Sequence, residues 1–224
     1  MKEAPKIKQR DPETLGSVMR GLVLSGAAIS LYGDSRPASG AEHHMSHYWE
    51  TILEQRGVRP AMHGEQVAVG TVLVLMLIEE LLKEDVDFDA ARESARAYDA
   101  AAWEREIRAH YGAAADEVVA MEHKAGKNAV EGRLTRIDSM QRNWDAVRAQ
   151  LETLPTSASV RALLRDIGCP CTPADIGVDD ELLMDTFRYC KEIRARYTVF
   201  QTVYDLGLTD KLAARVTAKA NSAD

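Results

Sequence analysis

The chain has 224 residues, of which 46% are hydrophobic, and its formal net charge is −7. This length and composition are typical of a soluble globular protein that can bury a sizeable core. The negative charge argues against binding to a phosphate backbone, which would require a basic face, so we expect no nucleic-acid partner.

The N-terminal segment and the cysteines indicate a cytoplasmic protein. The first residues, MKEAPKIKQRDP, are charged and lack the apolar core of a signal peptide. The chain has three cysteines, Cys169, Cys171 and Cys190. This number is small and odd, whereas a disulfide framework needs several pairs, so we expect reduced thiols. The longest apolar run, residues 67–78, is shorter than the roughly 20 residues that span a bilayer, so it predicts a buried helix and no membrane span.

The chain begins with a polar stretch, residues 1–10, that we expect to be a flexible stub. Asp11-Pro12-Glu13 then predicts a helix start, because Asp caps, Pro suits the first helical position and Glu complements the helix dipole. Apolar residues follow at helical spacing: Leu15, Val18, Met19, Leu22 and Val23. Tyr32-Gly33-Asp34 is expected to end this helix.

The next helix carries the first histidines. Ser39 and Glu42 have the spacing of a capping box, so the helix is expected to start there. His43 and His47 stand four residues apart and therefore share one helix face, with Glu50 one turn further along it. After a break at residues 57–60, His63 is expected to open a second, largely apolar helix that ends near Leu82.

Two histidines at this spacing, with a third at the start of an adjoining helix, can converge on one divalent cation such as Zn²⁺ or Fe²⁺. The same spacing also suits a pair that is solvent-facing or merely hydrogen-bonded. Both interpretations stay open from the spacing alone.

The rest of the chain predicts more helices, at residues 88–98, 101–111, 114–124, 130–154, 157–168, 180–196, 197–206 and 211–220. No alternating strand pattern and no glycine-rich dinucleotide fingerprint occurs. The sequence therefore predicts an all-α fold, an irregular multi-helix array over residues 11–220 around the helix 63–82.

The segments SRPASGAEHHMSHYWE and HGEQVAVGT resemble the metal-site region of the sn-glycerol-1-phosphate dehydrogenases. The resemblance runs from about residue 9 to about residue 212 and includes RARYT near its end. That family is related to the iron-type alcohol dehydrogenases and the dehydroquinate synthases. The resemblance implies the fold of the C-terminal metal-binding domain of the dehydroquinate synthase-like proteins, and a role in phospholipid metabolism.

By this resemblance, His43 and His63 are the metal ligands, and His47 is a catalytic residue beside the substrate. The metal would be Zn²⁺, with Fe²⁺ or Ni²⁺ as alternatives. Family members also have an N-terminal dinucleotide-binding domain, which binds NAD or NADP and supplies an aspartate as third ligand. We expect this chain to lack that domain and to contain no cofactor-binding residues of its own, so it should be inactive alone.

The loop before His43 is a candidate for substrate binding. A helix N-terminus attracts anions, so Arg36 and Ser39 could hold the phosphate of a polyol phosphate. The alternatives are a surface ion pair for Arg36 and a purely capping role for Ser39.

Two other functions stay open: a non-catalytic helical module with a vestigial metal site, and a related polyol dehydrogenase or dehydroquinate synthase-like enzyme. The expected protein partners are a separate dinucleotide-binding domain and further copies of the chain. Met45, Trp49 and Met62 are expected to flank an open apolar surface that drives homo-oligomer formation.

Overall fold

Helix α4 (His63–Leu82) lies at the centre of the fold, and its bounds confirm the helix predicted from its apolar sequence. It packs against α3 (Ala41–Gln55), α9 (Ser157–Asp166) and α12 (Thr209–Ala220). Its buried side chains include Val69, Leu73 and Leu77, which join one hydrophobic core with residues of α3. The core thus fixes α3 and α4 against each other.

The computed structural model describes residues 4–222, and the regular elements of that range are all helical. The all-α prediction is confirmed. The remaining α-helices are α1 (Ala4–Lys8), α2 (Pro12–Tyr32), α5 (Phe88–Arg96), α6 (Ala100–Tyr111), α7 (Ala115–Ala125), α8 (Val130–Leu151), α10 (Asp180–Tyr189) and α11 (Val199–Asp205). Three 3₁₀ turns connect them: η1 (Gly112–Ala114), η2 (Ala174–Ile176) and η3 (Cys190–Ile193).

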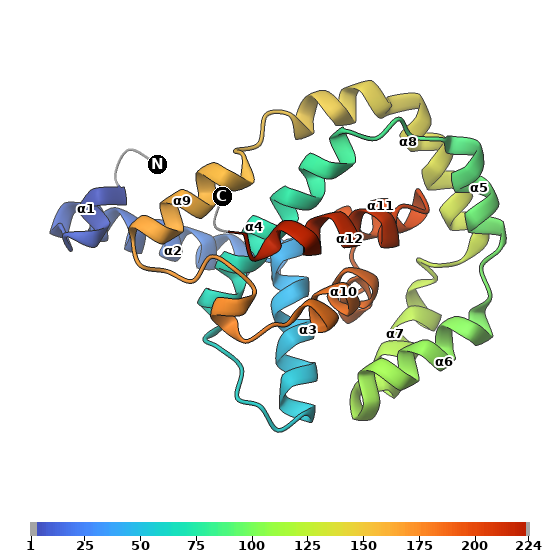
Figure 1. Ribbon diagram of the computed structural model, residues 1–224, viewed down its shortest axis with the longest axis horizontal. Coiled ribbons are helices and arrows are strands. Elements are labelled where there is room, and N and C mark those ends of the chain that lie inside the picture. Colours follow the sequence, from blue (N-terminus) through green and yellow to red (C-terminus); the bar gives the residue numbers. More distant parts are fainter. Residues whose placement is uncertain (1–3, 223–224) are drawn as a thin grey trace.

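Figure 1 shows how these helices are arranged. Helices α5 to α8 form an arc on one side, in which α5 packs on α8 and α6 on α7. Helices α10 and α12 pack together and lie beside α3 and α4. The short helix α1 falls within the residues expected to form a stub, and the flexibility of residues 1–10 stays a prediction.

One predicted helix is too long. The pattern predicted a helix over residues 180–196, but α10 ends at Tyr189, and η3 follows before the backbone becomes extended at Arg194. The tighter turn places Lys191 and Glu192 in the interior, where they bond each other and Asn128. Burial of these polar groups, rather than helical periodicity, therefore sets the end of α10.

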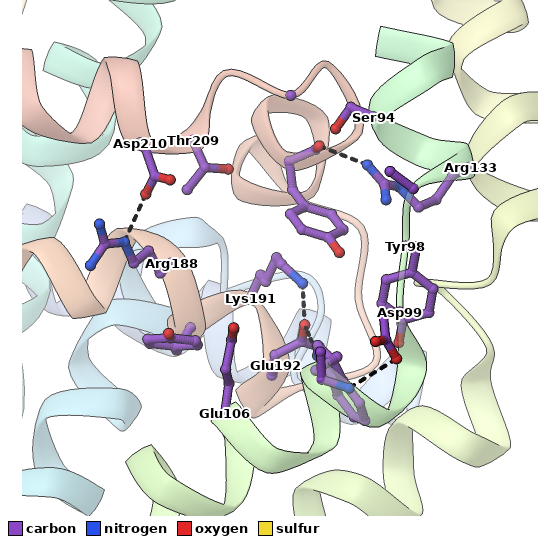
Figure 2. A pocket seen from close by; sticks show the side chains of 16 residues that line it. Ser94, Tyr98, Asp99, Glu106, Arg133, Arg188, Lys191, Glu192, Thr209 and Asp210 are labelled. Atoms are coloured by element: carbon purple, nitrogen blue, oxygen red, sulfur yellow. Dashed lines mark hydrogen bonds and ion pairs between the residues drawn. The ribbon is translucent and has the colours of Figure 1, made fainter.

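The buried charges of η3 border a cavity with a volume of about 580 Å³ (Figure 2). The ammonium group of Lys191 lies 3.8 Å from the ring centroid of Tyr204, and the guanidinium of Arg133 lies 4.2 Å from it. Arg133 also donates to the Tyr204 carbonyl and pairs with Asp205. The cations of Lys191 and Arg133 thus already have partners within the fold.

Helix α2 differs from the others because its apolar side chains are exposed. Its ends are as predicted: Asp11 accepts a hydrogen bond from the Thr14 amide, and Gly33 ends the helix in the left-handed region at φ 77°. Leu22, Val23 and Leu31 are mostly exposed. By length and composition alone, α2 is also apolar enough to cross a membrane. The absence of a membrane span therefore stays a prediction.

Candidate metal centre

The start of α3 positions the first histidine. Gly40 is the N-cap residue, and its amide donates to Glu42 Oε1 at 2.9 Å. Glu42 thus reaches back as predicted, but the prediction that Ser39 caps the helix is wrong. The Ser39 carbonyl instead accepts a hydrogen bond from the Arg196 guanidinium at 3.1 Å, and the helix begins one residue later than predicted.

Helix α3 has two different faces. Met45, Tyr48, Trp49 and Ile52 are buried in the core, so the prediction that Met45 and Trp49 flank an open surface is wrong. They are spaced at three and four residues and form the core face of the helix. The opposite face carries His43, His47 and Glu50, which are half-buried.

Helix α4 brings the third histidine to this face. Its first turn is capped by Glu65, which accepts from the Met62 amide at 3.0 Å. Further along, a Cβ atom at Gly70 would meet the Glu42 carbonyl at 3.0 Å, so glycine permits the close approach of α4 to α3. This contact and the core place His63, the first residue of α4, against α3.

The structure brings all three predicted histidines together. The ring centroids of His63 and His43 are 5.3 Å apart, those of His63 and His47 are also 5.3 Å apart, and those of His43 and His47 are 6.3 Å apart. Imidazoles that bind one tetrahedral ion at about 2.1 Å have ring centroids about 5 Å apart. The histidine cluster, His43, His47 and His63, therefore fits a divalent cation after small side-chain movements.

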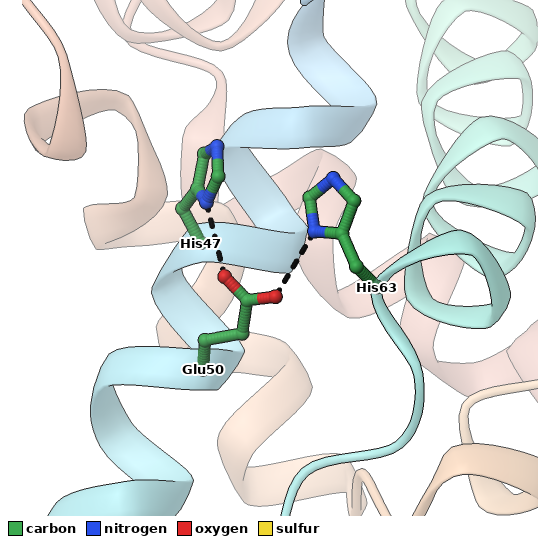
Figure 3. Close-up of side chains that lie close together, drawn as sticks. All are labelled: His47, Glu50 and His63. Atoms are coloured by element: carbon green, nitrogen blue, oxygen red, sulfur yellow. Dashed lines mark hydrogen bonds and ion pairs between the residues drawn. The ribbon is translucent and has the colours of Figure 1, made fainter.

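Glu50 connects two of these rings, as Figure 3 shows. Its Oε2 lies 3.0 Å from His47 Nδ1, and its Oε1 lies 3.0 Å from His63 Nδ1. One ligand atom from each of these three residues lies within 4.8 Å of the other two. The sequence placed Glu50 on the histidine face but gave no reason to assign it a role, because its contact with His63 depends on the packing of α4.

Charge in the cluster favours metal binding. Burial opposes ionisation of the Glu50 carboxyl, but hydrogen bonds with His63 and His47 outweigh it and lower its pKa. Burial lowers the pKa of His47, although the nearby Glu50 works in the opposite direction. The carboxylate is therefore charged and the His47 ring neutral near pH 7, the forms in which these side chains bind metals.

The predicted substrate-binding residues lie in the loop before α3. Arg36 is exposed and pairs with Asp34 at 3.6 Å, the ion pair considered as its alternative. Arg196 holds the same loop, because it donates to the Ser39 carbonyl and, at 2.6 Å and 2.9 Å, to Asp34 Oδ1 and Ser35 Oγ. These contacts join residues far apart in the sequence, so they could not be predicted for Arg196. Substrate binding by Arg36 and Ser39 stays a prediction.

The fold and the cluster define an all-helical chain with a donor set suited to a divalent metal. Comparison with known proteins gives its relatives. It is 27% identical over 198 residues to glycerol-1-phosphate dehydrogenase [NAD(P)+] of Geobacillus stearothermophilus, covering 84% of this chain and 38% of that protein. The corresponding enzyme of Pyrococcus furiosus is 44% identical over 77 residues, covering 34% of this chain and 21% of that protein.

A third enzyme of the same name, from Halalkalibacterium halodurans, is 25% identical over 199 residues, covering 89% of this chain and 40% of that protein. No family model and no solved structure matches the chain. The chain is thus homologous to the glycerol-1-phosphate dehydrogenases, which are oxidoreductases, and the predicted resemblance is confirmed. The match covers 38% of the length of the Geobacillus stearothermophilus enzyme and 40% of the length of the Halalkalibacterium halodurans enzyme, so this chain spans about two fifths of these relatives.

Proposed function

We propose that this chain is the metal-binding, substrate-side part of an NAD(P)-dependent sn-glycerol-1-phosphate dehydrogenase. The reaction would interconvert dihydroxyacetone phosphate and sn-glycerol 1-phosphate in the cytoplasm. The observation that carries the proposal is the convergence of His43, His47 and His63 on one face of α3, in a chain homologous to enzymes of that name.

The residues have distinct proposed roles. His43 and His63 would hold Zn²⁺ or a similar ion, such as Fe²⁺ or Ni²⁺. When bound, such an ion supplies Lewis-acid stabilisation of negative charge on the substrate oxygen. The ring centroid of His47 lies 5.3 Å from that of His63, so His47 would lie beside the ion. There it would contact the substrate and move the substrate's proton. Arg36 and Ser39, next to the N-terminus of α3, would bind the phosphate.

Binding of NAD or NADP would require a separate dinucleotide-binding domain. The sequence of this chain contains no glycine-rich fingerprint for a pyrophosphate. Holding a nicotinamide against the substrate can contribute about 7–11 kcal/mol to lowering a barrier. We therefore expect turnover only when such a domain accompanies the chain.

Substrate binding tests the proposal without requiring turnover. The Zn²⁺-loaded chain should bind sn-glycerol 1-phosphate more tightly than sn-glycerol 3-phosphate or glycerol in titration calorimetry. Arg36→Ala should weaken binding of the phosphate ester and leave glycerol binding unchanged. Equal binding of all three compounds, or binding that does not depend on Zn²⁺, would contradict the proposal and favour a non-catalytic module.

A further inference from the structure

The hydrogen bonds around His63 determine which of its ring nitrogens carries the proton. Gln66 donates from Nε2 to the Ala61 carbonyl at 2.7 Å, so its Oε1 is left as an acceptor. Ser46 Oγ lies 3.1 Å from this Oε1 and donates its single proton to it. Ser46 and Gln66 are both buried, which keeps water from replacing these contacts.

Ser46 can therefore only accept from its other neighbour. That neighbour is His63 Nδ1, at 3.0 Å. Glu50 Oε1 lies 3.0 Å from the same Nδ1, and an ionised carboxylate also only accepts. Two acceptors converge on His63 Nδ1, which must then carry the proton and leave Nε2 with a free lone pair.

The other two rings follow the same pattern. His47 Nδ1 lies 3.0 Å from Glu50 Oε2, and His43 Nδ1 lies 2.7 Å from Glu42 Oε1. In Figure 3 the second nitrogens of His47 and His63 both point away from Glu50. In metalloproteins a ligating histidine commonly donates its other N–H to a carboxylate or carbonyl, which fixes its tautomer and orientation.

We infer that Glu50 and the Ser46–Gln66 pair are positioning residues that hold His63 as its Nδ1–H tautomer and present Nε2 to the metal. Glu50 then stays outside the coordination shell, although its distances alone would also suit a direct ligand. The inference deepens the proposed function, because it concerns the same metal site.

Nitrogen NMR of the histidine side chains tests this directly. The chain labelled with ¹⁵N-histidine has six rings to assign, by single substitutions. In the metal-free protein, His63 should show a protonated Nδ1 and an unprotonated Nε2. Added Zn²⁺ should shift the His63 Nε2 resonance and leave Nδ1 protonated. A protonated Nε2 in the metal-free protein, or Zn²⁺ binding at Nδ1, would overturn the inference.

Two variants test whether the hydrogen bonds around His63 hold its tautomer. Gln66→Leu removes the acceptor for the Ser46 proton, so Ser46 can donate to His63 and the Nε2–H tautomer should become populated. Glu50→Gln replaces the carboxylate that accepts from both rings. Each should weaken Zn²⁺ binding by about 10- to 100-fold, the usual effect of losing such a hydrogen-bond partner.

Thr71→Val is the matched control, because the Thr71 hydroxyl on α4 bonds the Val67 carbonyl and no other group among residues 4–222. It should change neither the tautomer nor the affinity. Unchanged affinity in both test variants would overturn the inference. If Gln66→Leu does not fold, the tautomer of the parent and the Glu50→Gln affinity still decide the question. A parent that binds no Zn²⁺ would contradict the proposed function, whereas Zn²⁺ bound at Nδ1 would contradict this inference alone.

Discussion

Adjacent residues His43 and His44 lie in opposite environments. His43 faces the other two histidines, whereas His44 is 0% exposed, and neither of its ring nitrogens has a hydrogen-bond partner among the described residues. Burial, together with the charges of Lys127 and Arg196, lowers the pKa of His44 to about 4, so its ring stays neutral near pH 7. An unsatisfied buried polar group costs about 1–3 kcal/mol.

Replacing this ring with an apolar side chain of similar size should therefore stabilise the fold. We predict that His44→Leu raises the free energy of unfolding by about 1–2 kcal/mol, as measured by urea denaturation. His110→Leu is a useful contrast, because His110 stacks on Tyr189 and lies 3.6 Å from Asp185, so that change should destabilise. A loss of stability in His44→Leu would show that its nitrogens are satisfied in the folded protein.

Glu192 shows the opposite case, a buried charge with partners. It is 1% exposed and pairs with Lys191 and Lys127. Burial opposes ionisation, but Lys191 and Lys127 outweigh it and lower the pKa of Glu192 to about 2. Because this pKa is below its value of 4.5 in the unfolded chain, the stabilisation is present above pH 4.5 and is lost as the pH falls from 4.5 to about 2.

Glu192→Gln should leave the two lysines without their carboxylate. We predict a loss of about 3 kcal/mol in unfolding free energy at pH 7, and a flatter pH dependence below pH 4.5, from chemical denaturation. Glu54→Gln, at an exposed position, serves as control and should stay near the parent. A pH profile of Glu192→Gln parallel to that of the parent would contradict the assigned pKa.

At the scale of the element, the two site helices differ in how well the sequence predicts them. Helix α4 begins at His63 and ends at Leu82 as predicted, because its long apolar run and polar ends define it locally. The start of α3 was predicted one residue too early, because the Ser39 carbonyl accepts a hydrogen bond from Arg196, which is far away in the sequence. The roles of Glu50, Ser46 and Gln66 could not be predicted either, since they depend on the contact between α3 and α4.

Gly70 tests that contact. In Gly70→Ala the added Cβ would lie 3.0 Å from the Glu42 carbonyl oxygen, so the start of α3 must give by a few tenths of an ångström, which alters the position of His43 relative to His63. We predict weaker Zn²⁺ binding in titration calorimetry.

Gly64→Ala is the matched control on the same helix. A Cβ there meets no described residue within 4 Å, although Gly64 adjoins His63. It should raise stability by up to about 1 kcal/mol through helix propensity and leave Zn²⁺ affinity unchanged. Equal Zn²⁺ affinity in the two alanine variants would show that the close approach at Gly70 does not position the site.

For the whole molecule, the exposed apolar surface lies in a different place from the one predicted. Met45 and Trp49 are buried, and of the three residues expected at the surface only Met62 is exposed, at 71%. The larger exposed apolar area is on α2. Such surface tends to associate, so the predicted self-association is now expected through α2.

We predict that the purified chain sediments as a dimer or larger species at tens of micromolar, and that Leu22→Glu shifts it toward monomer. The charge would be unfavourable in any apolar contact made by the exposed side of α2. Val58→Glu, at another exposed apolar residue, should leave the sedimentation unchanged. A monomeric parent would contradict this expectation.

The most direct test of the account is titration calorimetry of Zn²⁺ into the purified, metal-free chain. The histidine cluster predicts one ion per chain, with binding that weakens sharply in His63→Ala and in His43→Ala and less in His47→Ala. His44→Leu should bind like the parent, because that side chain faces the core. Absence of binding in the parent, or binding that is unchanged in His63→Ala, would contradict the metal centre on which the proposed function rests.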